Sequence, residues 1–193
     1  MSESHSIILA AGRSTRMGQP KALLNYCGTT FIQHLVDIYG RFGPVSVVTN
    51  EDTRGAIARS VPQARILVNP EPERGLFSSV LLGVSSLAGN VSFYFVHPVD
   101  CPILDESVPA HMLSEARQRP EYTVFVPSLG GRSGHPVLLD PVIQKPLLAQ
   151  PPDAVFSTVL ELFGVCQVPV EEPSVLLNIN TPADYDTLVG ISP

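Results

Sequence analysis

The residues best suited to chemistry lie in a basic loop near the N-terminus that glycine punctuates. Gly12 and Gly18 delimit this loop, and Arg16 and Lys21 supply positive charge. Backbone N–H groups left exposed beside glycine can bind phosphate oxygens, and cations strengthen such a site. No acidic residue occurs between positions 3 and 37, so the segment carries a positive field. These features together favour a triphosphate site over a simple turn with solvated arginines.

The spacing of this loop excludes two common nucleotide motifs. From Gly12 to Lys21 the sequence fits neither GxxxxGK[ST] nor GxGxxG. A P-loop kinase and a nicotinamide-dependent dehydrogenase are therefore disfavoured.

The elements that must position this loop follow from hydrophobic patterning. The apolar run at 5–11 predicts a buried parallel strand, and apolar residues at helical spacing predict a helix over 30–42. The remaining pattern predicts strands at 45–49, 65–68, 92–96, 122–126, 165–168 and 175–179, and helices after Glu51, at 77–87, from Asp105, at 141–148, at 154–163 and from Pro182. This alternation predicts an α/β class, three-layer α/β/α Rossmann-like fold with a mostly parallel sheet, in a single domain over residues 1–193. Such sheets bind ligands at the carboxyl ends of their strands.

The composition of the 193 residues limits the class of protein. Hydrophobic residues make up 44% and charged residues 16%, which is typical of a globular chain. A net charge of −6 argues against binding to nucleic acid or to an anionic membrane. No apolar run approaches the ~20 residues of a membrane span, and we expect no export signal, because residues 1–5 are polar without a basic stretch ahead of an apolar one. The three cysteines form no CxxC pattern, so we expect a cytoplasmic protein without a disulfide framework.

Asp100 is the acidic residue that best fits a metal site. It follows the expected strand at 92–96, near the edge of the sheet where the basic loop should also lie. Mg²⁺ prefers carboxylate oxygen and keeps several waters, so one or two acids suffice. An aspartate two residues before a proline, like Asp100 before Pro102, can also simply cap a turn. From the residues alone, that interpretation is the more frequent one.

The opening segment resembles a known family. The family signature is similar to LAAGxSxRMGxxKxLL, and residues 9–24 match nearly every fixed position. This resembles the molybdenum cofactor nucleotidyltransferases, within the wider superfamily of nucleotidyltransferases that includes those for sugar nucleotides. The resemblance implies that nucleotide contacts come from Leu9, Ala10, Ala11 and Gly12, that Arg16 and Lys21 hold the phosphates, and that Asp100 binds Mg²⁺ in a strand-end DxP.

Other segments resemble the same family. Asn69-Pro70 with the following Gly75 to Ser79 is similar to NPxxxxGxxxS, which implies base and ribose contacts from Asn69, Ser78 and Ser79, although serine also caps helices. The segment with His135 resembles the GxxGHPV of the cytidylyl branch, on the acceptor side. Asn178 and Asn180 look more like the NxNTPxD of the guanylyl branch, and asparagine brings no second carboxylate.

The resemblance implies transfer of CMP or GMP from CTP or GTP to the molybdenum cofactor, molybdopterin, with release of pyrophosphate and with a molybdoenzyme client as partner. Two alternatives remain open. One is transfer to a sugar or polyol phosphate, because the opening signature is shared across the superfamily. The other is a non-catalytic nucleotide- or cofactor-binding protein, which Asn180 favours because it is uncharged.

Overall fold

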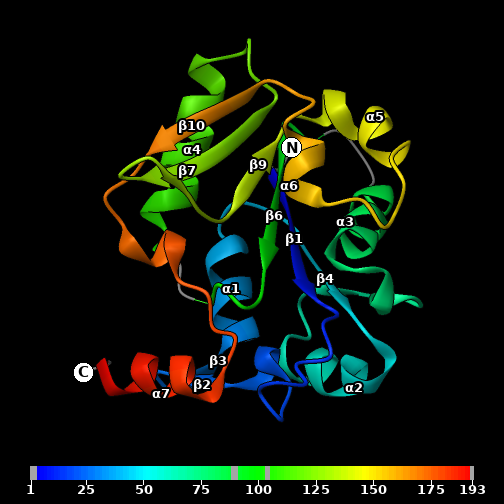
Figure 1. The fold of residues 1–193 in the computed structure, drawn as a ribbon, viewed down its shortest axis with the longest axis vertical. Helices are drawn as coiled ribbons and strands as arrows, with labels where there is room; N and C mark the ends of the chain where they lie inside the picture. The colour runs from blue at the N-terminus through cyan, green and yellow to red at the C-terminus, as the bar shows by residue number, and fades with distance from the viewer. Residues whose placement is uncertain (1–3, 88–90, 103–104, 192–193) are drawn as a thin grey trace.

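The strands come together in one central sheet. The structure is a computed structural model, and it describes residues 4–87, 91–102 and 105–191. The described residues form an eight-stranded sheet with the order β10-β7-β9-β6-β1-β4-β5, in which β8 pairs with β7 (Figure 1). Its strands are β1 Ser4–Ala10, β4 Val45–Thr49, β5 Arg65–Val68, β6 Phe93–Pro98, β7 Val124–Leu129, β8 Arg132–Ser133, β9 Val137–Leu139 and β10 Val165–Pro169.

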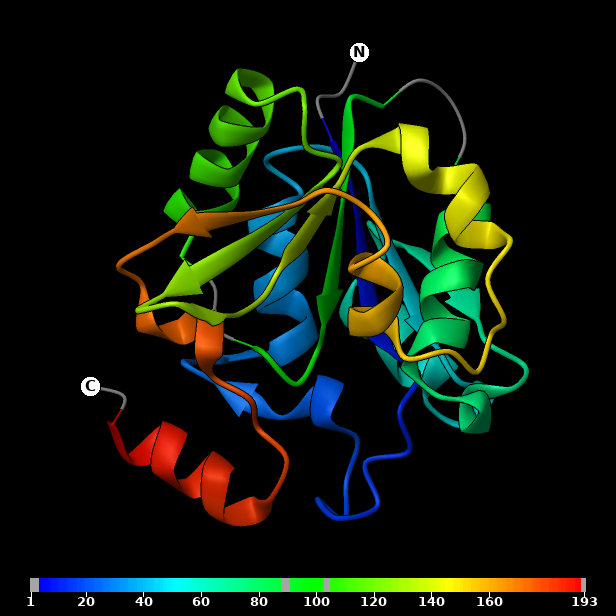
Figure 2. The same ribbon diagram turned by 45° about the horizontal axis from the view of Figure 1, so that its top comes forward.

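Helices cover both faces of the sheet (Figure 2). They are α1 Phe31–Tyr39, α2 Glu51–Ser60, α3 Leu76–Ser85, α4 Ser107–Gln118, α5 Gln144–Leu148, α6 Phe156–Leu160 and α7 Pro182–Ile191. A small hairpin of β2 Asn25–Tyr26 and β3 Thr29–Thr30 lies beside α7, where the Tyr185 hydroxyl donates to the Asn25 carbonyl (Figure 1).

The central strand β1 separates two hydrophobic cores. It pairs in parallel with β4 and β6, and every described residue in it is buried. Because side chains alternate along a strand, Ile8 and Ala10 enter one core while Ile7 and Leu9 enter the other. This two-sided burial explains why the strand reads as an uninterrupted apolar run.

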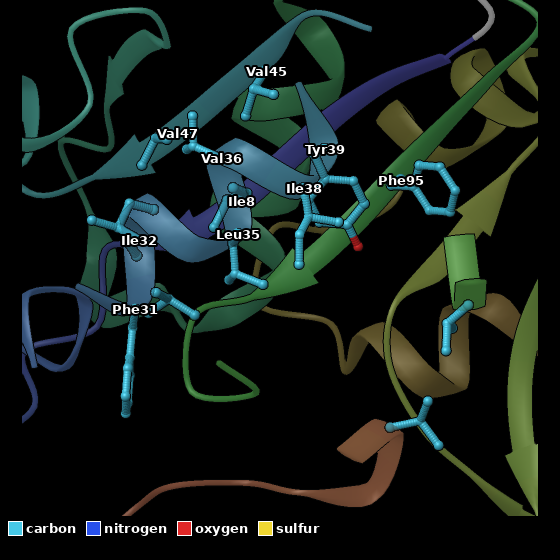
Figure 3. Close-up of a cluster of buried hydrophobic side chains, with 14 of the residues drawn as sticks. Ile8, Phe31, Ile32, Leu35, Val36, Ile38, Tyr39, Val45, Val47 and Phe95 are labelled. Carbon is cyan, nitrogen blue, oxygen red and sulfur yellow. The ribbon is translucent and has the colours of Figure 1, made fainter. Parts of the chain in front are cut away.

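Helices α1 and α4 pack in the first core. Helix α1 begins at a capping box, in which Thr30 accepts from the Gln33 N–H and the Gln33 side chain accepts from the Thr30 N–H. Its apolar side chains lie against β1 and β4, and the Tyr39 ring lies beside Phe95 of β6 (Figure 3).

Helices α3, α5 and α6 pack in the second core. Gly83 allows α3 to approach β1 closely, because a Cβ at that position would collide with the side chain of Ile7. Helix α3 therefore starts beside the carboxyl end of β1, where the basic loop also begins.

The predicted fold class is confirmed, since the sheet is mostly parallel with helices on both faces.

The strand predicted at 175–179 is wrong. Residues 175 and 176 instead end a 3-10 helix, Pro173–Leu176, and residues 177–179 continue without regular secondary structure. Pro173 starts this helix, and the Glu172 side chain caps it by accepting from the Ser174 N–H. The antiparallel strand β9 and the hairpin of β2 and β3 were not predicted, because three- and two-residue strands show no measurable periodicity.

Candidate functional site

The basic loop and Asp100 meet at the carboxyl ends of β1 and β6. These strands are parallel neighbours, and their register places Leu9 opposite Pro98. The two chain segments that follow them therefore leave the sheet side by side. They line a cavity of about 250 Å³ whose walls are Leu9, Ala10, Gly12, Ser14, Thr15, Arg16, Pro20, Lys21, Ala22, Thr53, Leu76, Pro98, Val99, Asp100 and Asn180.

The basic loop is shaped by a turn at Ser14. Ser14 has φ 50°, and its carbonyl accepts from the N–H groups of Met17 and Gly18. Its hydroxyl accepts from the Lys21 N–H, which sets the start of the short helix that carries Lys21. Met17 is buried in the first core and anchors the turn. The loop is thus fixed in place, while Arg16 stays exposed at the cavity wall.

Gly12 borders the cavity, and the packing of the protein does not require a glycine at this position. Among the described residues, no heavy atom outside Gly12 and its chain neighbours lies within 4 Å of the place that a Cβ would occupy. Its backbone φ also lies outside the left-handed region. A glycine that neither packing nor conformation demands is expected where a ligand approaches the backbone.

Lys21 and Asp100 face each other inside the cavity. The Lys21 Nζ lies 3.4 Å from Asp100 Oδ2, and the two side chains are 13% and 28% exposed. The same Nζ donates to Asn180 Oδ1 at 2.7 Å. The cation and the acid that the sequence predicted are therefore in contact, and Lys21 is also bonded to an amide oxygen from a third segment of the chain.

The C-terminal segment crosses this edge of the sheet and is bonded to it. The Ile179 N–H donates to the Asp100 carbonyl at 2.7 Å, and Asn180 Nδ2 donates to Asn178 Oδ1 at 2.7 Å. Asp184 accepts from the N–H groups of Asn180 and Thr181, and these bonds lower the pKa of its carboxyl. Asp184 therefore caps the last helix, and Asn178 holds the Asn180 side chain from outside the cavity.

A second cavity, also of about 250 Å³, continues from the first. Leu9, Ala11, Gly12, Pro72, Gly75, Leu76 and Ser79 line it. Asn69 lies behind this wall, where its side-chain amide donates to the hydroxyls of Ser78 and Ser79 at 2.9 Å each. Asn69 thus ties the loop after β5 to the start of α3, and of the three residues only Ser79 lines this cavity.

His135 lies apart, in a larger cavity of about 740 Å³. Leu76 borders both this cavity and the one with Lys21. Burial lowers the pKa of His135, although the Asp100 charge acts in the opposite direction. Its Nδ1 is buried without a hydrogen-bond partner in the described part of the chain. His135 is therefore a neutral polar group within electrostatic reach of Asp100.

Several residues that shape the site were not predicted from the sequence. Asn50 caps α2 and donates from Nδ2 to the Ala11 carbonyl at 2.9 Å, which fixes the backbone just before Gly12. An asparagine directly after the strand at 45–49 was the available signal. Ser14 gave no such signal, although its hydrogen bonds are local. His97, whose ring nitrogens lie 2.7 Å from the Tyr39 hydroxyl and from the Cys101 carbonyl, gave none because Tyr39 is distant in the sequence.

The residues around Asp100 fit a magnesium ion that takes most of its ligands from phosphate and water better than they fit a metal site made wholly of protein ligands. The described residues contain no group of three or more His, Cys, Asp or Glu side chains that could hold a metal. Asp100 offers one partly exposed carboxylate beside the basic loop. One carboxylate together with phosphate oxygens and water is the usual coordination of Mg²⁺ at nucleotides.

Comparisons with known proteins agree with this architecture. A probable molybdenum cofactor guanylyltransferase of Bacillus cereus is 28% identical over 134 residues, which cover 68% of this chain. The match spans 65% of that relative's length.

Among the described residues, no helix has both the length and the apolar character that crossing a membrane requires.

Two solved structures share the fold. Rv0371c from Mycobacterium tuberculosis superposes with a TM-score of 0.80 at 21% identity, over 98% of each chain. The molybdopterin-guanine dinucleotide biosynthesis protein A of Archaeoglobus fulgidus superposes with a TM-score of 0.74 at 18% identity, over 97% of each chain. The model of the MobA-like NTP transferase domain matches residues 6–162, and the chain therefore belongs to that family.

Proposed function

We propose that this protein is a Mg²⁺-dependent nucleotidyltransferase that transfers CMP or GMP from CTP or GTP to molybdopterin and releases pyrophosphate. The observation that carries the proposal is the contact between Lys21 and Asp100 in a cavity that Gly12 and Arg16 also line. Cations for the phosphates and one acid for a metal are the parts that this chemistry needs.

In the proposed reaction, the α-, β- and γ-phosphates lie along the basic loop. Arg16 and Lys21 stabilise the negative charge of the triphosphate, and the free space beside Gly12 lets the nucleotide approach the backbone. When bound, Mg²⁺ at Asp100 would neutralise charge on the leaving pyrophosphate.

The nucleophile in this proposal is the phosphate of the acceptor. One of its oxygens forms a bond to the α-phosphorus, while the bond between that phosphorus and the oxygen bridging to the β-phosphorus breaks. The electron pair of the broken bond leaves with pyrophosphate. The protein supplies position and charge rather than a covalent intermediate, so no nucleophilic side chain is required.

The acceptor is proposed to enter from the side of His135. The larger cavity there meets the nucleotide cavity at Leu76, so an acceptor bound in it would reach the α-phosphate without crossing the sheet. The neutral imidazole of His135 would contribute a hydrogen bond to the acceptor. Asn180, which lines the nucleotide cavity, would contribute another, with its side chain oriented by Asn178.

The indications of which nucleotide is used point in opposite directions. The Bacillus relative and the asparagine pair favour GTP, whereas the AAG opening and the GHPV segment favour CTP. Pyrophosphate release, measured with each labelled triphosphate, Mg²⁺ and molybdopterin, tests both the reaction and the base. Release with a sugar or polyol phosphate in place of molybdopterin would assign the acceptor differently.

The position of Asn180 favours a second candidate, a non-catalytic protein that binds nucleotide or cofactor for a client enzyme. Its amide oxygen sits 2.7 Å from Lys21, where a carboxylate would add a second metal ligand. Tight binding of a triphosphate, seen as a raised melting temperature, without turnover on any acceptor would support this candidate.

A further inference from the structure

His97 forms a hydrogen-bonded link between helix α1 and the turn that carries Asp100. It lies on β6 and is 1% exposed. Its Nδ1 is 2.7 Å from the Tyr39 hydroxyl, and its Nε2 is 2.7 Å from the Cys101 carbonyl. Both ring nitrogens are therefore engaged, one with a helix and the other with the residue after Asp100.

The partners fix the tautomer of the ring. A carbonyl oxygen can only accept, so Nε2 carries the proton and donates to Cys101. Nδ1 then has a lone pair and accepts from the Tyr39 hydroxyl. Burial lowers the pKa of His97 to about 3 and raises that of Tyr39, so the ring is neutral and the phenol keeps its proton at pH 7.

Four hydrogen bonds hold the backbone of the turn from Pro98 to Pro102. At its start, the Val99 N–H donates to the Leu9 carbonyl of β1 at 3.0 Å. The Pro98 carbonyl accepts from the Cys101 N–H, the Asp100 carbonyl from the Ile179 N–H, and the Cys101 carbonyl from His97. Val99 thus fixes the start of the turn to β1, and His97 fixes its end, at Cys101, to helix α1 through Tyr39.

We propose that His97 is a positioning residue, which, through Tyr39 on one side and the Cys101 carbonyl on the other, holds the Asp100 turn so that its carboxylate faces Lys21. The proposal rests on the proposed function for its effect on rate, but the geometry itself can be tested without any reaction. An apolar side chain of similar size could fill the same space in the core but could not hold the carbonyl.

The first test measures position. In a crystal structure of the His97→Leu variant, we expect the distance from Lys21 Nζ to Asp100 Oδ2 to exceed the present 3.4 Å by roughly 1 Å, because the Cys101 carbonyl is no longer held. An unmoved Asp100 would overturn the proposal. This result does not depend on whether the protein has the proposed activity.

The second test measures rate. A displacement of this size costs about 100-fold in kcat when the displaced group acts in the transition state. Since Arg16 and Lys21 remain, the triphosphate KM should change by less than about 3-fold. His97→Gln retains a donor near the place of Nε2, so it should recover at least about 10-fold of the loss. Tyr39→Phe removes one neutral hydrogen bond and should lower kcat by about 3- to 10-fold.

His5 provides the matched control. It is another buried strand histidine, with Nε2 2.9 Å from the Ser46 hydroxyl, and it lies at the opposite end of β1. His5→Leu should reduce stability but leave kcat per folded molecule unchanged. An equal fall in kcat for both leucine variants, or normal kcat in His97→Leu, would contradict the proposal.

A variant that does not fold and an unmodified protein that shows no turnover both leave the role of His97 testable. If His97→Leu does not fold, His97→Gln and Tyr39→Phe decide the proposal by the same two readouts. If the unmodified protein shows no turnover with any triphosphate and acceptor, the proposed function fails, and the position of Asp100 in the variants still decides the role of His97.

Discussion

Replacing Asp100 by asparagine separates the two roles that an aspartate in a DxP turn can have. On the structural side, the change removes an ion pair with a separation of 3.4 Å between Lys21 Nζ and Asp100 Oδ2. The pair is partly exposed, so its loss should cost about 1 kcal/mol. Lys21 also keeps its bond to Asn180 Oδ1. For a chain of this length the melting temperature should then fall by about 2 to 4 °C.

The effect on turnover should be far larger. Among the described residues that line the cavity, Asp100 is the only acid, so nothing replaces its charge. Removing one group that stabilises developing charge costs on the order of 10³-fold in kcat, which corresponds to about 4 kcal/mol. The loss of transition-state stabilisation therefore exceeds the loss of folding stability several times over.

The assay is pyrophosphate release under saturating Mg²⁺ and triphosphate, with thermal unfolding measured on the same preparations. Asp37→Asn is the control, because it removes one negative charge from an exposed position on α1. Turnover within about 10-fold of the unmodified protein would refute the role of Asp100 in catalysis. A fall in melting temperature of well over about 4 °C with little change in rate would identify it as a turn residue.

Three other predictions address the loop and the core. Lys21→Gln should weaken triphosphate binding by about 10- to 100-fold, as expected for a charged hydrogen bond, and Lys145→Gln on exposed α5 should not, as isothermal titration can show. Gly12→Ala should keep the melting temperature within about 2 °C, because its methyl group meets no protein atom, yet weaken triphosphate binding; unchanged affinity would mean that no ligand approaches there. Because burial lowers the pKa of His97 to about 3, its contribution to stability is complete above about pH 6.5 and is lost as pH falls towards 3. Between pH 7.5 and 5.5 that loss should be about 1.4 kcal/mol in urea unfolding, and a His97→Gln variant with the same pH dependence would contradict it.

The parts of the fold that the sequence predicted well are those with strong local patterns. Strand β1 reads as an apolar run because both of its faces are buried. Helix α1 has clear helical spacing and a capping residue at Thr30. Strands β4 and β5 and helix α7 also lie where the pattern places them. In each case the local preference and the tertiary environment agree.

The errors occur where tertiary contacts determine the structure. Residues 175–179 are rich in apolar side chains, but Val175 and Ile179 are buried in the core without joining the sheet. Strand β9 is three residues long and inserts antiparallel between β6 and β7. Neither arrangement leaves a periodic signal in the sequence.

The same distinction applies to the candidate site. Lys21 and Asp100 could be placed near each other from sequence, because both follow strands whose carboxyl ends share one edge of the sheet. Their contact with Asn180 could not, since it depends on the path of the C-terminal segment. The placement of His135 in a separate cavity was likewise unpredictable, because the antiparallel β9 sets it.

The contacts of Asn180 bring a segment outside the family match to Lys21. The family match ends at residue 162, so it includes Gly12, Lys21 and Asp100 but not the segment that carries Asn180. That segment is nevertheless bonded directly to the turn of Asp100 through the Ile179 N–H. The charge that faces Lys21 is thus determined partly by a region outside the matched domain. Because the Asn180 amide bonds Lys21 without adding a carboxylate, the residue at this position decides how many acids face Lys21.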